Sequence, residues 1–134
     1  MDQAALLTPV FVLVFWTFIV ATIMIFGRIK HVKNVQRDAA HTKDLSGNLP
    51  AWVERASDNY NHLFEQPVAF YVVTLAIVAI NRIDPFIIQL AWAFVLLRII
   101  HSLVQLTFNY VKLRFAIFAT AWVVVAYMAS SQLF

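Results

Sequence analysis

An apolar run near the start of the chain, Leu6–Gly27, contains no charged residue. A helix needs about 20 apolar residues to cross the roughly 30 Å of hydrocarbon in a bilayer, and this run is long enough to do so. It differs from a secretory signal peptide because no basic residue precedes it and because it is too long for the apolar part of such a peptide. We therefore expect a membrane-spanning helix that stays in the mature protein.

Three later segments have a similar character. The chain of 134 residues is 62% hydrophobic and only 13% charged, whereas soluble domains carry about 25% charged residues. Turn-forming residues separate the segments: Ser46–Pro50 precedes the second, and Asp84 followed by Pro85 can cap the third. The sequence predicts an all-α membrane protein, a single domain over residues 1–134 forming a four-helix bundle, with transmembrane helices at about 6–27, 51–80, 85–109 and 115–133.

The second predicted helix, 51–80, is polar in its first half and apolar from Val68 to Ile80. We expect it to begin in the cytoplasmic interface and then to enter the membrane. Pro67 lies inside this segment. Because proline lacks a backbone donor, it predicts a kink in the helix.

The distribution of basic residues predicts the orientation. The first and third connections and the start of the second predicted helix hold Arg28, Lys30, Lys33, Arg37, Lys43, Arg55, Lys112 and Arg114. The second connection holds only Arg82, and both termini lack Lys and Arg. The positive-inside rule then places the first and third connections in the cytoplasm and both termini outside. The net charge of +3 therefore reflects basic residues that set the orientation in the membrane. We expect membrane lipids rather than nucleic acid as partners.

Thiol and metal chemistry are limited by the residue types present. The chain has no cysteine, so disulfides, cysteine-ligated metals and a cysteine nucleophile are excluded. The four histidines, His31, His41, His62 and His101, lack the spacing of a zinc site, and we expect no metal. A thiol that reacts here must therefore come with a substrate.

Polar residues recur at helical spacing in two segments that should be buried in part. One stripe consists of Glu54, Asp58, Asn61 and Glu65, flanked by Arg55, His62 and Gln66. The other consists of Arg98, Ser102, Gln105 and Asn109, with His101 at its edge. A charged group at the centre of a membrane helix costs about 2.5–3.5 kcal/mol on insertion scales, so such residues are usually paired or functional. We expect Arg98 to face the bundle interior.

These stripes admit two interpretations. In the structural one, Arg98 and Glu65 neutralise each other across the bundle, and His101 and Gln105 form interhelical hydrogen bonds. In the functional one, a polar cavity opens to the cytoplasm between the first half of 51–80 and the last half of 85–109. Arg55, Arg98 and Arg114 would give it positive charge suited to a small anionic ligand, because guanidinium groups bind carboxylates in bidentate fashion.

The two stretches together resemble the signatures of the MAPEG superfamily (membrane-associated proteins in eicosanoid and glutathione metabolism). One runs from Glu54-Arg55 to Asn61-His62-Leu63-Phe64-Glu65-Gln66-Pro67, and the other from Arg98-Ile99-Ile100-His101-Ser102 to Asn109-Tyr110-Val111-Lys112-Leu113-Arg114. The likeness extends through the order and lengths of all four helices and is closest to bacterial members. It implies a left-handed four-helix bundle that assembles as a homotrimer and binds glutathione between protomers near the cytoplasmic face.

The resemblance also implies roles for individual residues. Arg114 corresponds to the arginine thought to stabilise the glutathione thiolate, and is the expected catalytic residue. The expected glutathione-binding residues are Arg55, His62, Glu65, Arg98, His101 and Gln105. The chain departs from the family pattern at three positions: Asp58 replaces an arginine, His62 an asparagine and Gln105 a tyrosine.

The leading functional hypothesis is a glutathione-dependent or related thiol-dependent transferase or peroxidase. It would act on lipophilic electrophiles that partition from the bilayer, as a homotrimer in the bacterial inner membrane. One alternative is a non-catalytic MAPEG-fold membrane or lipid-binding protein. Another is a small multidrug-type transporter, although such exporters usually carry a glutamate in the first helix, where this chain has no charge.

Overall fold

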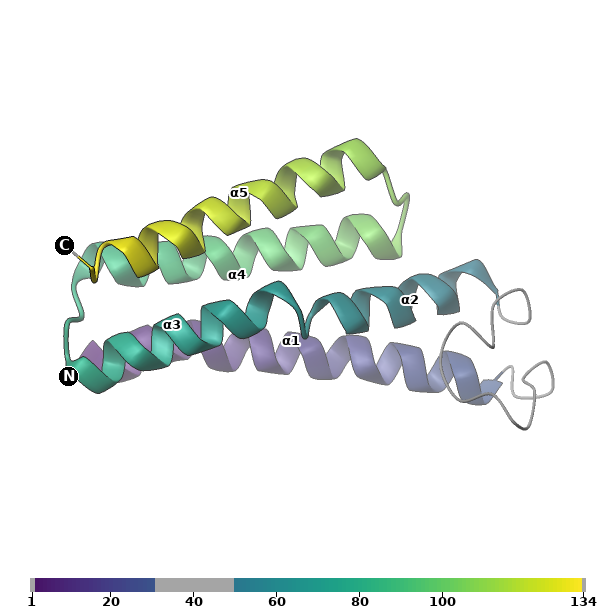
Figure 1. Ribbon diagram of the computed structural model, residues 1–134. Helices are drawn as coiled ribbons and strands as arrows, with labels where there is room; N and C mark the ends of the chain where they lie inside the picture. Colours follow the sequence, from purple (N-terminus) through teal and green to yellow (C-terminus); the bar gives the residue numbers. More distant parts are fainter. Residues whose placement is uncertain (1, 31–49, 134) are drawn as a thin grey trace.

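The computed structural model describes residues 2–30 and 50–133. Its helices are α1 (Asp2–Lys30), α2 (Ala51–His62), α3 (Gln66–Ile80), α4 (Pro85–Leu106) and α5 (Val111–Ser130). The helices run side by side along one long axis, and α1 begins at the same end of the bundle at which α5 ends (Figure 1). Within the described residues, four segments are long and apolar enough to cross a membrane, with α2 and α3 together forming one of them. The predicted all-α bundle of four spans is confirmed.

The second span is two helices rather than one kinked helix. α2 ends at His62, a turn covers Leu63–Glu65, and α3 begins at Gln66, so Pro67 lies in the first turn of a new helix. A continuous helix would need the missing N–H of Pro67 as the partner of the Leu63 carbonyl. The chain therefore leaves the helix before Pro67. In the turn, the N–H groups of Leu63, Phe64 and Glu65 donate hydrogen bonds to carbonyls of α2 at 3.0–3.1 Å. The predicted span 51–80 is therefore present, but Pro67 lies at the start of a second helix instead of kinking a single one.

The connections at the two ends of α4 have clear local causes. The side chain of Asp84 accepts a hydrogen bond from the Ile87 N–H at 3.0 Å, and Pro85 occupies the first helical turn, as predicted. At the other end α4 stops at Leu106 rather than at Asn109, and α5 begins at Val111 rather than at residue 115. Lys112 and Arg114 therefore belong to the first turn of α5 and not to a link.

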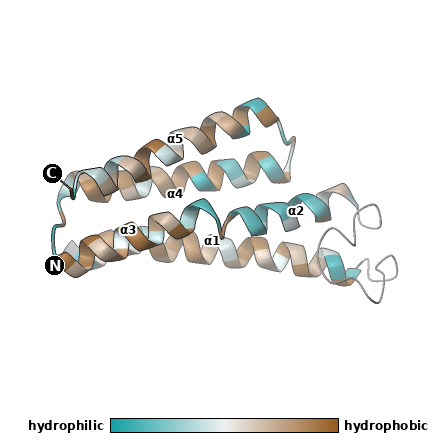
Figure 2. Cartoon of the chain, in the orientation of Figure 1, coloured by the Kyte–Doolittle hydropathy of each residue, from teal (hydrophilic) through white to brown (hydrophobic). Residues whose placement is uncertain are grey.

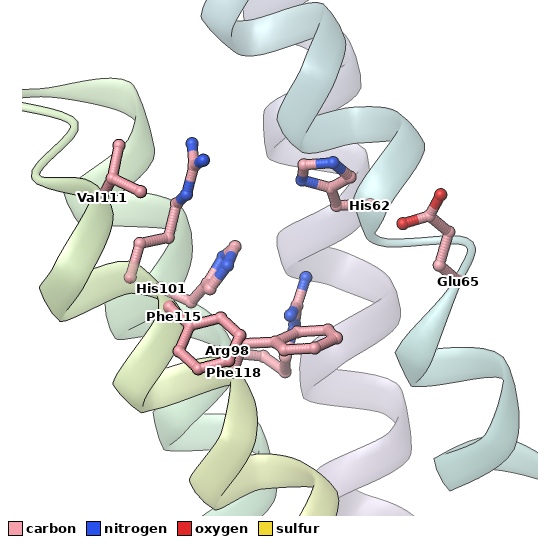
Figure 3. A pocket seen from close by; sticks show the side chains of 8 residues that line it. His62, Glu65, Arg98, His101, Val111, Phe115 and Phe118 are labelled. Carbon is pink, nitrogen blue, oxygen red and sulfur yellow. The ribbon is translucent and has the colours of Figure 1, made fainter.

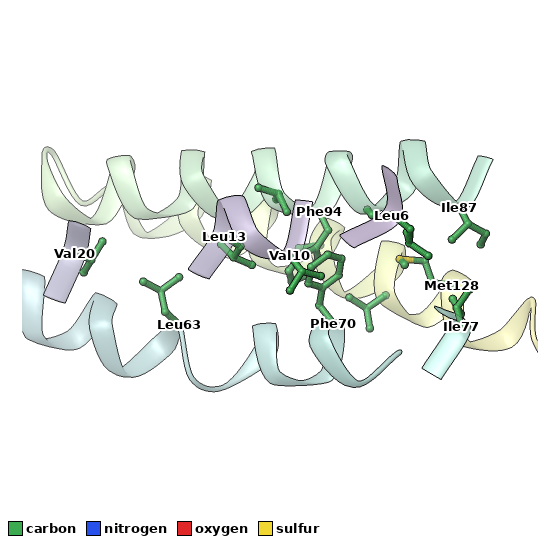
Figure 4. Packing of buried hydrophobic residues seen from close by; sticks show 14 residues of the cluster. Leu6, Val10, Leu13, Val20, Leu63, Phe70, Ile77, Ile87, Phe94 and Met128 are labelled. Atoms are coloured by element: carbon green, nitrogen blue, oxygen red, sulfur yellow. The ribbon is translucent and has the colours of Figure 1, made fainter. Parts of the chain in front are cut away.

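The apolar core lies along the centre of the bundle (Figure 4). The rings of Phe70 on α3 and Phe94 on α4 stack with centroids 4.4 Å apart, and Leu6 and Leu13 of α1 are fully buried in the same cluster. Large apolar side chains also cover much of the outer surface, as expected for helices that face lipid. Hydrophilic residues gather instead along α2 (Figure 2).

Gly27 sets the approach of α1 to α2. A β-carbon at this position would lie 2.8 Å from the Val53 side chain and 2.9 Å from the Trp52 ring. Real β-carbons do not approach other atoms so closely, so any other residue would require α2 or these side chains to move. The glycine therefore fixes how closely the polar helix packs on the first span.

Candidate functional site

A cavity of about 250 Å³ lies between the end of α2, the middle of α4 and the start of α5 (Figure 3). Its lining consists of two arginines, two histidines, one glutamate and three apolar residues: Arg98, Arg114, His62, His101, Glu65, Val111, Phe115 and Phe118. Five of the seven residues expected to form a site are thus brought together. The cavity carries two guanidinium groups against a single carboxylate, so its charge favours an anion.

Arg98 lies in the interior of the bundle, with 1% of its surface exposed. Its Nη1 donates a hydrogen bond to Oε1 of Gln66 at 3.1 Å, while Glu65 is exposed. Glu65, the partner of Arg98 in the structural interpretation, lines the same cavity, but the hydrogen bond of Arg98 goes to the next residue along the chain. Nε and Nη2 of Arg98 are also buried and have no hydrogen-bond acceptor in the described part of the protein.

Gln66 is held by a second contact. Its Nε2 donates to the backbone carbonyl of Phe118 in α5 at 3.0 Å. The residue therefore links the start of α3 to both α4 and α5. It is polar and buried next to Pro67, where the break in the helix turns its side chain inward.

Arg114 lies at the other side of the cavity and is partly buried. Its Nη1 donates to Oδ1 of Asn109 at 2.7 Å. Asn109 has φ of 51°, in the left-handed region that asparagine tolerates better than most residues, and its N–H bonds the Val104 carbonyl at 2.7 Å. Asn109, in the connection between α4 and α5, thereby orients the guanidinium at the start of α5.

Two imidazoles face each other across the cavity. The ring centroids of His62 and His101 are 6.3 Å apart with the planes inclined at 71°, and Figure 3 shows Arg98 pointing toward the space beside them. His101 is buried, and its Nδ1 has no hydrogen-bond partner among the described residues. No group of three His, Asp or Glu residues in the described ranges could hold a metal ion, and the adjacent arginines oppose a cation at this position.

The remaining wall is apolar and partly open. Phe115 and Phe118 lie together in the lower part of Figure 3, and Val111 lies above them on the same side of the cavity. Phe115 is 67% exposed although it lines the cavity. The apolar side of the cavity is therefore continuous with the outer surface of α5.

Two of the expected site residues lie elsewhere. Arg55 donates to the backbone carbonyl of Thr107, where it holds the connection after α4, and it does not line the cavity. Gln105 is buried in α4 away from the lining, with its Oε1 unpaired among the described residues. Within the first half of the predicted second helix, only its end lines the cavity, through His62 and Glu65, whereas Asp58 and Asn61 are exposed on the outer face.

The sequence reasoning missed several residues that build the site. Gln66 and Asn109 position the two arginines, and Val111, Phe115 and Phe118 supply the apolar wall. Asn59 is fully buried and accepts a hydrogen bond from Ser102 at 3.1 Å, which joins α2 to α4. A signal existed for Gln66, since it is a polar residue between Glu65 and a proline at the start of an apolar run.

Comparison with known proteins agrees with this architecture. The family model described as MAPEG family matches residues 6–134, nearly the whole chain. Neither the curated proteins nor the solved structures contain a match to this chain. The four apolar spans and the family match make it an integral membrane protein. The chain belongs to the MAPEG family.

Proposed function

We propose that this protein is a thiol-dependent enzyme: a transferase that joins glutathione or a related thiol to lipophilic electrophiles, or a peroxidase that reduces a lipophilic peroxide while two thiols are oxidised to a disulfide. The observation that carries the proposal is the composition of one cavity, in which two guanidinium groups and two imidazoles face an aromatic wall. The polar side suits a charged thiol, and the apolar side suits a second reactant that dissolves in the bilayer. Holding both in one cavity is what a conjugation reaction requires.

Arg114 is the residue assigned to thiol activation. A cation beside a thiol lowers the pKa of the thiol, and the thiolate is the reactive nucleophile. The hydrogen bond from Arg114 to Asn109 holds the guanidinium at the edge of the cavity. This supports a fixed cation that is ready before the thiol binds, which reduces the reorganisation needed in the reaction.

The charged ends of the thiol are assigned to two other residues. A thiol tripeptide such as glutathione carries two carboxylates and one ammonium group. The free Nε and Nη2 of Arg98 can donate to a carboxylate, and the exposed carboxylate of Glu65 can pair with the ammonium. His62 and His101 supply further donors between these two residues.

The second reactant would enter from the membrane. Phe115 both lines the cavity and is largely exposed on the surface of α5. Val111 has the same two properties, with 60% of its surface exposed. A lipophilic electrophile can therefore reach the thiol without passing through water.

The proposal includes an assembly and an orientation. We infer a homotrimer in the bacterial inner membrane, with both termini outside. The basic residues Arg28, Lys30, Arg55, Lys112 and Arg114 lie on segments at one end of the bundle, whereas Arg82 lies at the end where α1 begins (Figure 1). This separation supports the orientation derived from the positive-inside rule.

The test is thiol conjugation by the purified protein. Glutathione and 1-chloro-2,4-dinitrobenzene give a product that absorbs in the near ultraviolet, so turnover can be followed directly. Arg114→Ala should lower kcat by about 100-fold, the usual effect of removing one preorganised charge-stabilising donor, and should raise the apparent pKa of the bound thiol. Arg114→Lys should be intermediate, because the charge remains and the planar fork is lost.

Arg82→Ala is the matched control, because Arg82 is exposed at the opposite end of the bundle. It should leave kcat unchanged. Wild-type protein with no turnover above the uncatalysed rate would refute the transferase assignment. Glutathione binding without turnover would then favour the non-catalytic alternative.

A further inference from the structure

Gln66 joins three helices at the inner side of the cavity. It is the first residue of α3, and only 2% of its surface is exposed. Its Nε2 donates to the Phe118 carbonyl of α5, and its Oε1 accepts from Nη1 of Arg98 in α4. Both ends of one buried amide are therefore used, each by a different helix.

These two contacts determine which way the amide faces. A backbone carbonyl can only accept, so the nitrogen of Gln66 must face Phe118, and the oxygen must then face Arg98. The reversed amide would put two donors against the guanidinium and an oxygen against a carbonyl, at the cost of two buried unsatisfied groups. The side chain consequently has a single favourable orientation.

The orientation of Gln66 in turn selects an edge of the Arg98 guanidinium. Nη1 is engaged by Gln66, whereas Nε and Nη2 are buried without an acceptor among the described residues. Nε–H and one Nη2–H project in parallel from the same edge, and their spacing matches the two oxygens of a carboxylate. Arg98 lines the cavity, and a carboxylate that reached this buried edge would supply the acceptors that it lacks within the described residues.

We propose that Gln66 is a positioning residue: by holding Nη1 it directs the Nε–Nη2 edge of Arg98 to the ligand and makes this end of the cavity select a carboxylate over a neutral group of the same shape. The inference rests on the proposed function only in identifying the cavity as the thiol site. The selectivity itself can be measured without any thiol.

The experiment compares benzoate with benzamide, which have nearly the same shape and differ in charge. Binding of each to the full-length protein in detergent is measured from the rise in melting temperature with concentration. Wild-type protein should bind benzoate about tenfold more tightly than benzamide, since a bidentate charged pair replaces neutral contacts. Gln66→Met keeps the volume and removes both hydrogen bonds, and it should reduce the ratio to about twofold or less.

A second variant tests the same point with less change in shape. Gln66→Glu puts a carboxylate against Arg98 in competition with the ligand, and it should abolish the preference for benzoate. It also decides the question if Gln66→Met does not fold. Thr74→Val is the control, because Thr74 is fully buried on the same helix and does not line the cavity, and it should keep the wild-type ratio.

The outcomes separate the two proposals. A wild-type ratio near one, or an unchanged ratio in both Gln66 variants, would overturn the role of Gln66. If glutathione conjugation is absent while the benzoate preference exists and depends on Gln66, the transferase proposal fails and the positioning role stands. If conjugation occurs without any preference for benzoate, the transferase proposal stands and the positioning role of Gln66 fails.

Discussion

The two arginines of the cavity are held in different ways. Arg98 lies in the middle of α4 and depends on Gln66, which is 32 residues earlier and on another helix. Arg114 lies in the first turn of α5 and depends on Asn109, five residues earlier. The position of Arg98 is therefore a property of the packed bundle, whereas that of Arg114 is a property of one turn. Substitution of each arginine should consequently change stability and activity to different extents.

The largest difference is expected in stability. Arg98→Ala should lower the free energy of unfolding by about 3 kcal/mol, because it opens a cavity in the bundle and leaves Oε1 of Gln66 without its donor. Arg114→Ala should cost about 1 kcal/mol or less, since this side chain is only partly buried and its contact is local. Unfolding in mixed detergent micelles measures both values.

Equal losses of stability in the two variants would contradict the distinction between a packed and a local arginine. A shared decrease would mean that α5 depends on Arg114 as much as the bundle depends on Arg98.

An intermediate effect should come from the turn itself. Asn109→Gly keeps the left-handed backbone and loses the acceptor of Arg114, so conjugation should fall by about fivefold, as expected for one net hydrogen bond, with little change in stability. Asn109→Ala should lose the same activity and also about 1 kcal/mol of stability, because alanine is strained at this φ. Paired melting and rate measurements on the two variants separate orientation from backbone strain. If Asn109→Gly keeps full activity, the hydrogen bond does not position Arg114.

The smallest effect is expected on the outer face of α2. Asp58→Arg restores the residue of the family signature, but Asp58 is exposed and does not line the cavity. It should tighten glutathione binding by about twofold, through an attraction that solvent and salt screen. Titration at low and high ionic strength measures this. Tightening of tenfold or more that survives high salt would mean that the residue contacts the ligand directly, which the cavity of one protomer does not predict.

Much of the fold followed from local features of the sequence. The uncharged run Leu6–Gly27 and the three later apolar segments predicted spans, because length and apolar composition decide whether a helix can cross the hydrocarbon. Asp84 and Pro85 predicted the start of α4 because a cap is a local interaction. The break at Leu63–Glu65 was missed because a proline can kink or end a helix, and packing around it decides which occurs.

The site could be predicted only in part. Helical spacing predicted the stripes that hold Arg98, His101, Glu65 and His62, charge suggested Arg114, and the family resemblance assigned these residues their roles. The partner of Arg98 could not be chosen, because Glu65 and Gln66 are adjacent and the turn before α3 decides which of them faces inward. Phe115 and Phe118 were unremarkable members of an apolar segment, and only the start of α5 at Val111 brings them to the cavity.

The close contact at Gly27 gives α2 a mechanical property. α2 is a rigid rod of 12 residues, about 18 Å long at 1.5 Å per residue, with Gly27 against its first turn and His62 at its last residue. Because the rod ends at the Leu63–Glu65 turn, a push at Val53 need not be carried into α3. We expect the turn at Leu63–Glu65 and the hydrogen bond from Ser102 to Asn59 to limit how far such a displacement moves His62. A larger residue at position 27 should therefore act on the cavity from a distance, because the helix that it would displace ends at His62, which lines the cavity.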